Sequence, residues 1–90
     1  MSDLRNGTLH LDRLPAQQWA HVIDVPLPQA GAGRAVVIRL MELGFVPGER
    51  VCIVAEGPGL GGPLAVRVGH TTFALRRHEA AYIQVAPIVA

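Results

Sequence analysis

The ten residues 39–48 constrain the fold of this chain most, because they end a helix and turn the chain toward a strand. Gly44 stands where helices commonly end in a left-handed residue, and Phe45 is the apolar residue expected to fold back on Leu40 in a Schellman motif. Pro47 prevents the helix from restarting, and Pro47-Gly48 favours a turn. The segment therefore predicts a helix that stops at residue 43 and a strand that follows the turn.

The helix that this segment closes is predicted over residues 34–43. Helical spacing places five apolar side chains on one side, namely Val36, Val37, Leu40, Met41 and Leu43. The opposite side carries Ala35, Ile38, Arg39 and Glu42. A helix of this length is marginal alone in water. We therefore expect it to dock on a sheet through its apolar side.

Short stretches of alternating apolar and polar residues predict strands along the rest of the chain. They cover residues 20–25, 49–55, 64–68 and 71–75, and a last strand around Ile83 and Val85. Gly69-His70 suits a two-residue hairpin turn, and residues 77–81 predict a 3₁₀ turn. A closed barrel would leave no exposed sheet edge. The sequence thus predicts a mainly β fold, a small SH3-like five-stranded barrel with one inserted α-helix between its first two strands.

Ninety residues are enough for one domain with one modest core. We expect a disordered tail over residues 1–8 and a single domain over residues 9–90. The one cysteine, Cys52, excludes an internal disulfide framework and fits a reducing compartment. The N-terminus does not read as a signal peptide, and no apolar run approaches the roughly 20 residues that span a bilayer. The expected location is the cytoplasm.

The charged residues are nearly balanced, with a formal net charge of +1. Every basic residue is an arginine, and the eight arginines are scattered along the chain rather than gathered on one element. Nucleic-acid-binding proteins usually concentrate positive charge and interleave it with aromatic residues. Binding to nucleic acid is therefore not expected.

The sequence does not indicate an enzyme. The glycine-rich residues 57–63 join two strands, whereas a phosphate-binding loop leads from a strand into a helix. Cys52 lies in the middle of a strand, where cysteines are usually inert, and the only serine is Ser2. No nucleophile, base and orienting group stand together. We expect no catalytic residues and no required cofactor.

The histidines and the cysteine raise the question of a metal site. If the first two strands pair, His21 and Cys52 approach each other, and His78-Glu79 is a second loose pair. These four residues are the candidate ligands for a transition metal such as Fe²⁺ or Zn²⁺. The alternative is that scattered histidines bind metal adventitiously, because structural sites need clustered ligands.

The polar side of the predicted helix is the candidate partner-binding surface. Ile38 is apolar there but is surrounded by charged residues, and the candidate set is Arg34, Ile38, Arg39 and Glu42. A small apolar contact rimmed by charge is the composition of a transient protein interface. The alternative is a solvated face with a weak Arg39–Glu42 contact.

Four segments of the chain together resemble the FeoA family of small components of bacterial ferrous iron transport. They are residues 8–15, the helix-ending residues 39–48, residues 63–68 and residues 74–80. The resemblance covers residues 9–89, with Ala16 where the family usually has glycine. Related SH3-like domains end iron-dependent repressors, but those proteins carry further N-terminal domains for which 90 residues leave no space.

The resemblance implies a non-enzymatic accessory protein that binds the cytosolic GTPase region of the FeoB permease and modulates its activity. It would then reach the membrane only through that partner, with the polar helix side and the loop at residues 57–62 as the contact surfaces. Two alternatives are a carrier of Fe²⁺ and a generic SH3-like module for proline-rich peptides. The second needs an aromatic groove, and the chain offers only Trp19, Phe45, Phe73 and Tyr82. The sequence also allows a homo-oligomer.

Overall fold

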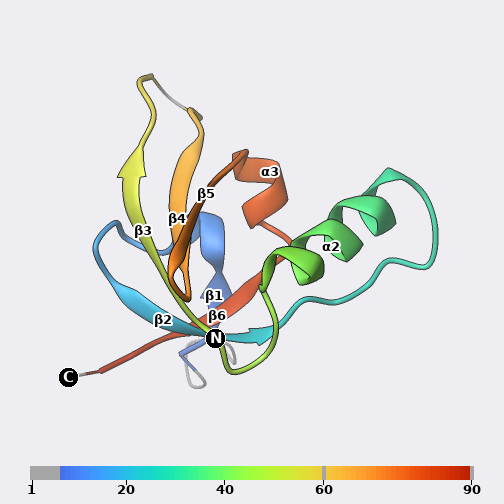
Figure 1. Ribbon diagram of the computed structural model, residues 1–90, viewed down its shortest axis with the longest axis horizontal. Coiled ribbons are helices and arrows are strands. Elements are labelled where there is room, and N and C mark those ends of the chain that lie inside the picture. The colour runs from blue at the N-terminus through green and yellow to red at the C-terminus, as the bar shows by residue number, and fades with distance from the viewer. Residues whose placement is uncertain (1–6, 60, 90) are drawn as a thin grey trace.

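The computed structural model describes residues 7–59 and 61–89. These residues form strands with short helices between some of them. In chain order they are β1 (Leu9–His10), the 3₁₀ helix η1 (Leu11–Arg13), β2 (Trp19–Asp24), α2 (Ala32–Leu43), β3 (Arg50–Glu56), β4 (Leu64–Val68), β5 (Thr71–Leu75), α3 (Arg77–Ala80) and β6 (Gln84–Pro87). The α-helix of twelve residues, α2, is inserted between two strands of the sheet, as the sequence predicts (Figure 1).

The strands form one antiparallel sheet in the order β1-β6-β2-β3-β4-β5. The mainly β, SH3-like arrangement with an inserted helix is confirmed, but the sheet has six strands rather than five and is open rather than closed. The additional strand is β1, in which Leu9 pairs with Val85 and His10 with Gln84. Two residues are too few to show an alternating pattern. The outermost strands, β1 and β5, are not paired with each other.

The predicted helix ending is confirmed in detail. Gly44 adopts the left-handed conformation with φ 112°. The Phe45 amide donates to the Leu40 carbonyl at 3.0 Å, and the Gly44 amide donates to the Met41 carbonyl at 3.0 Å. These are the two hydrogen bonds of a Schellman motif. The helix starts at Ala32, two residues earlier than the sequence predicts, after a glycine cap at Gly31.

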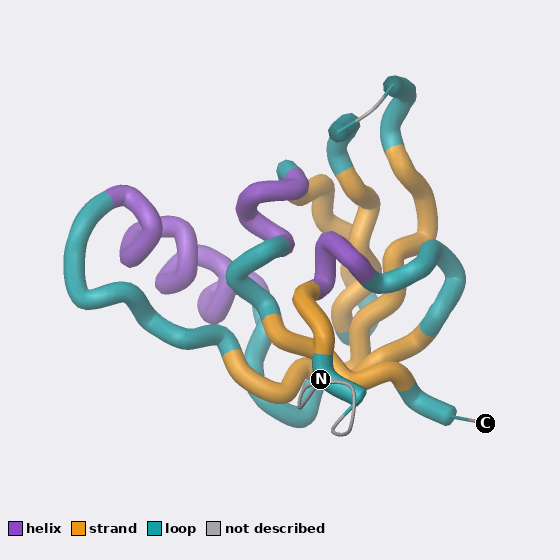
Figure 2. Tube along the Cα trace, turned by 180° about the vertical axis from the view of Figure 1, so that it is seen from behind, coloured by secondary structure: helices purple, strands orange, loops and turns teal. Residues whose placement is uncertain are grey.

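The core lies between the concave side of the sheet and the apolar side of α2. Its largest members are at most 1% exposed. They come from η1, α2, the turn after α2, the strands and the residue before β6: Leu11, Val37, Leu40, Phe45, Val51, Leu64, Val66, Leu75, Ile83 and Val85. Fully burying each such side chain contributes roughly 1.5–3 kcal/mol. Figure 2 shows α2 at one side of the sheet, with α3 between α2 and η1.

Two further local predictions have clear outcomes. The β4–β5 hairpin has the predicted strands and turn, with Val68 opposite Thr71 and Gly69 at φ 58°. The predicted 3₁₀ turn over residues 77–81 is instead the single α-helical turn α3. Its amides at Ala80 and Ala81 donate to the carbonyls four residues earlier, at 3.0 Å each. None of the helices in the described residues is long and apolar enough to cross a membrane.

Candidate functional site

The residues predicted to meet a partner lie together on the outer side of α2. Val37 and Leu40 face the core with no exposed surface, whereas 37% of Ile38 is exposed. Arg34, Arg39 and Glu42 are also exposed. The 3.6-residue period that buries one side of the helix leaves these four residues on the other side.

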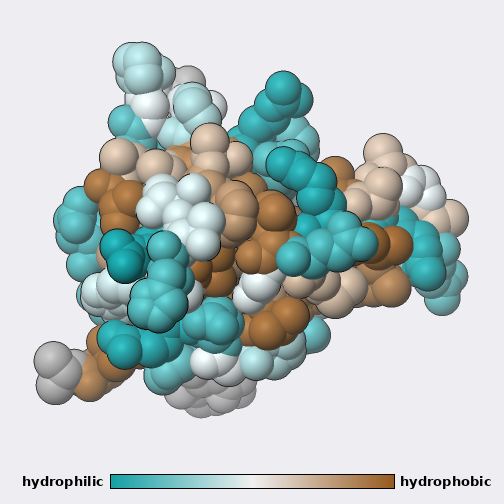
Figure 3. All heavy atoms as spheres, in the orientation of Figure 1, coloured by the Kyte–Doolittle hydropathy of each residue, from teal (hydrophilic) through white to brown (hydrophobic). Residues whose placement is uncertain are grey.

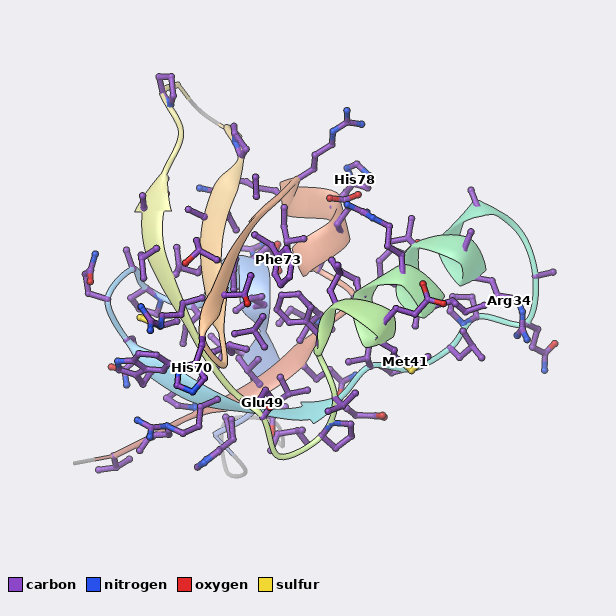
Figure 4. The ribbon with its side chains drawn as sticks, in the orientation of Figure 1. Arg34, Met41, Glu49, His70, Phe73 and His78 are labelled. Atoms are coloured by element: carbon purple, nitrogen blue, oxygen red, sulfur yellow. The ribbon has the colours of Figure 1, made fainter. Side chains whose placement is uncertain are left out.

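Arg34 has a structural role at the beginning of α2. Its Nη1 donates to the Pro28 carbonyl at 3.1 Å, and its amide donates to the Gly31 carbonyl at 3.1 Å. The side chain thereby ties the loop before the helix to the first helical turn. Figure 4 shows Arg34 at the end of α2 that lies farthest from the sheet.

Arg39 pairs across the molecule rather than along its own helix. Its Nη1 lies 3.1 Å from Oε2 of Glu79 in α3, and the two side chains are 52% and 13% exposed. Within the described residues Arg39 makes no hydrogen bond to Glu42, which the sequence suggested as its neighbour. The ion pair joins α2 to α3 at one edge of the outer side of α2.

Glu79 also closes the N-terminus of α3. Its Oε1 accepts a hydrogen bond from the Arg76 amide at 2.8 Å, three residues earlier, as the glutamate of a capping box does. This bond is the main reason that the pKa of Glu79 is lowered. Burial opposes the shift, and the hydrogen bond and charge of Arg39 add to it. The carboxylate is therefore held ionised and fully engaged.

A polar hollow lies where these contacts meet. It has a volume of about 460 Å³ and is lined by Arg39, Pro63, Ala74, Leu75, Arg76 and Glu79; we call it the α2–α3 crease. Figure 3 shows hydrophilic atoms passing over α3 toward the middle of α2, between more apolar areas. The sequence did not single out Arg76 as a site residue. Its only signal was the Arg76-x-x-Glu79 spacing at the start of a short turn.

We expect Glu79→Gln to make the free energy of unfolding depend less on pH between pH 7 and pH 3. A carboxylate whose pKa is lowered by folding stabilises the native state above its unfolded pKa, and this contribution is lost as the pH falls through the folded pKa. At pH 7 the variant should lose roughly 0.3–1 kcal/mol, the usual size of the interaction between a carboxylate and a helix N-terminus, because glutamine removes the charge but can still accept the Arg76 hydrogen bond. Urea unfolding between pH 7 and pH 3 measures both quantities. Glu42→Gln is the matched control, because Glu42 is exposed on the same surface; an equal effect there would contradict the assignment.

The candidate metal ligands are not gathered into one cluster. His21 stands opposite Arg50 and Trp19 opposite Cys52, so His21 and Cys52 are diagonal neighbours on one sheet face. His21 is exposed, while Cys52 is 2% exposed and burial raises its thiol pKa, with a hydrogen bond from the Gln17 amide opposing.

The second candidate pair is His78 and Glu79, whose side chains have different surroundings. His78 is exposed, and the carboxylate of Glu79 is bound to Arg39 and to the α3 N-terminus. Across residues 7–59 and 61–89, no three His, Cys, Asp or Glu residues are placed to hold a metal ion together.

The four aromatic side chains do not line a common groove. Phe45 is fully buried, and its ring lies 6.3 Å from that of Phe73 at an angle of 55°. Tyr82 packs over Gly33 so closely that a Cβ there would lie 2.5 Å from the tyrosine oxygen. Trp19 lies elsewhere, on β2 beside Arg50. The groove that binds polyproline peptides needs several exposed aromatic residues side by side, which this arrangement does not supply.

The open sheet, the inserted helix and the polar crease define a small SH3-like domain.

The chain belongs to the FeoA family: the model of the FeoA domain matches residues 9–87. Among solved structures, FeoA of Stenotrophomonas maltophilia in complex with zinc is 47% identical, with a TM-score of 0.73 over 86% of this chain and 88% of that chain. FeoA of Chlorobium tepidum is 32% identical, with a TM-score of 0.75 over 90% of this chain and 71% of that chain. No curated protein sequence matches.

The same fold occurs in proteins of another class. IdeR of T. acidophilum has a TM-score of 0.71 at 15% identity, over 90% of this chain and 34% of that chain. At that identity only the fold is shared. The SH3-like domain is thus one part of larger proteins, whereas the Stenotrophomonas protein has nearly the length of the domain alone.

Proposed function

We propose that this protein is a non-enzymatic accessory of ferrous iron transport that binds the cytosolic part of the FeoB permease and modulates its activity. Membership of the FeoA family supports a role in ferrous iron transport as an accessory protein. The Stenotrophomonas relative is itself described as a candidate activating factor of bacterial ferrous iron transport. In this proposal the protein works in the cytoplasm and reaches the membrane through its partner.

The proposed contact surface is the outer side of α2 with Arg34, Ile38, Arg39 and Glu42. The observation that carries it is the setting of Ile38, an apolar side chain that is 37% exposed beside the Arg39–Glu79 ion pair. An apolar centre with a charged rim is the usual composition of a transient interface. Because Arg39 is paired with Glu79 of α3, this one residue of the rim is partly positioned before a partner binds, which reduces the entropy lost on binding.

Modulation requires that the protein distinguish two states of its partner. A bound protein shifts a conformational equilibrium only by the difference between its affinities for the two states. The nucleotide cycle of the permease's GTPase region supplies two such states. The proposal therefore predicts unequal affinity for the GDP and GTP forms, not merely binding.

Calorimetric titration against the purified cytosolic region of FeoB tests this prediction. We expect saturable binding, with Kd values that differ by about fivefold or more between GDP and a non-hydrolysable GTP analogue, because couplings between sites are commonly 1–3 kcal/mol. Absence of binding in both states would overturn the proposal. Equal affinities would show that the complex forms but that it does not modulate the permease through the nucleotide cycle.

A second candidate function is delivery of Fe²⁺ to the permease. The zinc in the Stenotrophomonas structure favours it, as does the placement of His21 and Cys52 as diagonal neighbours. Burial of Cys52 works against it, because the thiol would have to become exposed and deprotonated to bind metal. An anaerobic titration showing Fe²⁺ bound at one equivalent, and lost in Cys52→Ala, would favour the carrier.

A further inference from the structure

A second hollow, lined by charged side chains and an indole ring, lies on the sheet, away from the α2–α3 crease. It has a volume of about 340 Å³ and is lined by Trp19, Glu49, Arg50, Arg67, Gly69 and His70; we call it the Trp19 pocket. Figure 4 shows His70 and Glu49 at the same end of the sheet, well separated from Arg34 on α2 and His78 on α3.

The strand register explains why two arginines share this pocket. Cys52 stands opposite Trp19 on one side and opposite Arg67 on the other, so these three side chains lie in one row on the same sheet face. Arg50 is two residues from Cys52 and therefore points to the same face. Arg50 and Arg67 are thus diagonal neighbours on paired strands, and such residues are roughly 7–8 Å apart.

The guanidinium group of Arg50 is already positioned by Trp19. It lies 5.1 Å from the centre of the indole ring, within the range of a cation–π contact. Stacking covers one face of the guanidinium but leaves its N–H edge free to bind two oxygens of a carboxylate at once. An ordered guanidinium loses less entropy when it binds than a freely moving one does.

The positive charge in the pocket exceeds the negative charge. Arg67 donates through Nε to the Gly69 carbonyl at 3.4 Å, which leaves its two terminal nitrogens for other acceptors. Glu49 is the one carboxylate in the lining, and its Oε2 accepts from the Arg50 amide at 3.2 Å. Among the described residues, neither Arg50 nor Arg67 forms a side-chain ion pair. The lining therefore carries two arginines against one carboxylate.

We propose that the Trp19 pocket binds a side-chain carboxylate from an acidic segment of a protein partner. Charge complementarity favours an acidic ligand, and the half-buried tryptophan beside two exposed arginines is the composition of an interface hot spot. The pocket is built from side chains on an open sheet face. Small phosphate sites, by contrast, usually rely on backbone N–H groups at a helix or a glycine-rich loop.

A capped hexaglutamate peptide is the probe for this site, and Trp19 is the reporter, since it is the only tryptophan in the chain. We expect saturable change of tryptophan fluorescence at low salt. Arg50→Gln and Arg67→Gln should each raise the Kd, measured by calorimetry, by about tenfold. This is the equivalent of one lost charged hydrogen-bonding partner. Arg13→Gln is the matched control, because it also removes one positive charge and its side chain is 81% exposed.

Three results would overturn the proposal. The first is the absence of saturable binding by the peptide. The second is an equal loss of affinity in Arg13→Gln, which would show a general charge effect rather than a pocket. The third is displacement of the peptide by an equivalent concentration of inorganic phosphate at constant ionic strength, which would indicate a small-anion site. None of these measurements involves FeoB, so their outcome is independent of the proposed function.

Discussion

Phe45→Ala is expected to lower the free energy of unfolding by about 3–5 kcal/mol, the usual cost of removing a buried phenylalanine ring. Phe45 is the largest fully buried side chain in the described residues. Its ring contacts Phe73, and its amide closes the last turn of α2. Small domains are stable by only about 5–15 kcal/mol. The variant should therefore lose a large part of its stability.

Thermal unfolding followed by circular dichroism measures this effect. The melting temperature should fall by more than about 10 °C, because 1 kcal/mol shifts the melting temperature of a domain of this size by roughly 4–8 °C. The matched control is Val46→Ala at the next residue, where 40% of the side chain is exposed; its change should stay within about 0.5 kcal/mol. A small shift in Phe45→Ala would show that the core reorganises around the missing ring.

The residues around Phe45 also show how much of the fold follows from local sequence. Gly44, Phe45 and Pro47 act within a few residues of each other, so the helix ending could be predicted and is confirmed. The β4–β5 hairpin could be predicted for the same reason, since Gly69-His70 fixes both the turn and the register. Features set by one turn of backbone are visible in the sequence.

Features set by distant contacts are not visible in this way. The Arg39–Glu79 ion pair joins residues 40 positions apart, and Arg39 had a nearer candidate partner in Glu42. Only the docking angle of α2 decides between them. Likewise, the alternation in β3 predicts that Arg50 and Cys52 share a face, but the register with β2 and β4 is needed to place Trp19 and Arg67 beside them.

The open sheet could not be predicted for the same kind of reason. Five strands could be predicted from alternation, and the sequence predicts a closed barrel because closure would leave no exposed edge. Instead β1 pairs with β6 through only two residues, which places β1 at one edge and β5 at the other. Closure depends on strand tilt and shear across the whole sheet, and no local pattern in 90 residues reports these quantities.

Ile38→Asp is expected to weaken binding to the cytosolic region of FeoB by about tenfold or more, because truncating or charging a central contact commonly costs at least 1–2 kcal/mol. The carboxylate would stand in the apolar centre of the proposed interface without a partner. Ile38 is a sharper test than Arg39, since replacing Arg39 would also break its ion pair with Glu79. Calorimetry gives the Kd, and Fe²⁺ uptake in cells carrying the variant should fall with it.

The matched control for this variant is Ile23→Asp on β2. The two isoleucines have similar exposure, 37% for Ile38 and 45% for Ile23, but lie on different elements. Both variants should fold, because neither side chain belongs to the buried core. If Ile23→Asp weakened binding and Ile38→Asp did not, the permease would dock on the sheet rather than on α2. The outer side of α2 would then be a solvated face, and the ion pair between Arg39 and Glu79 would serve the fold alone.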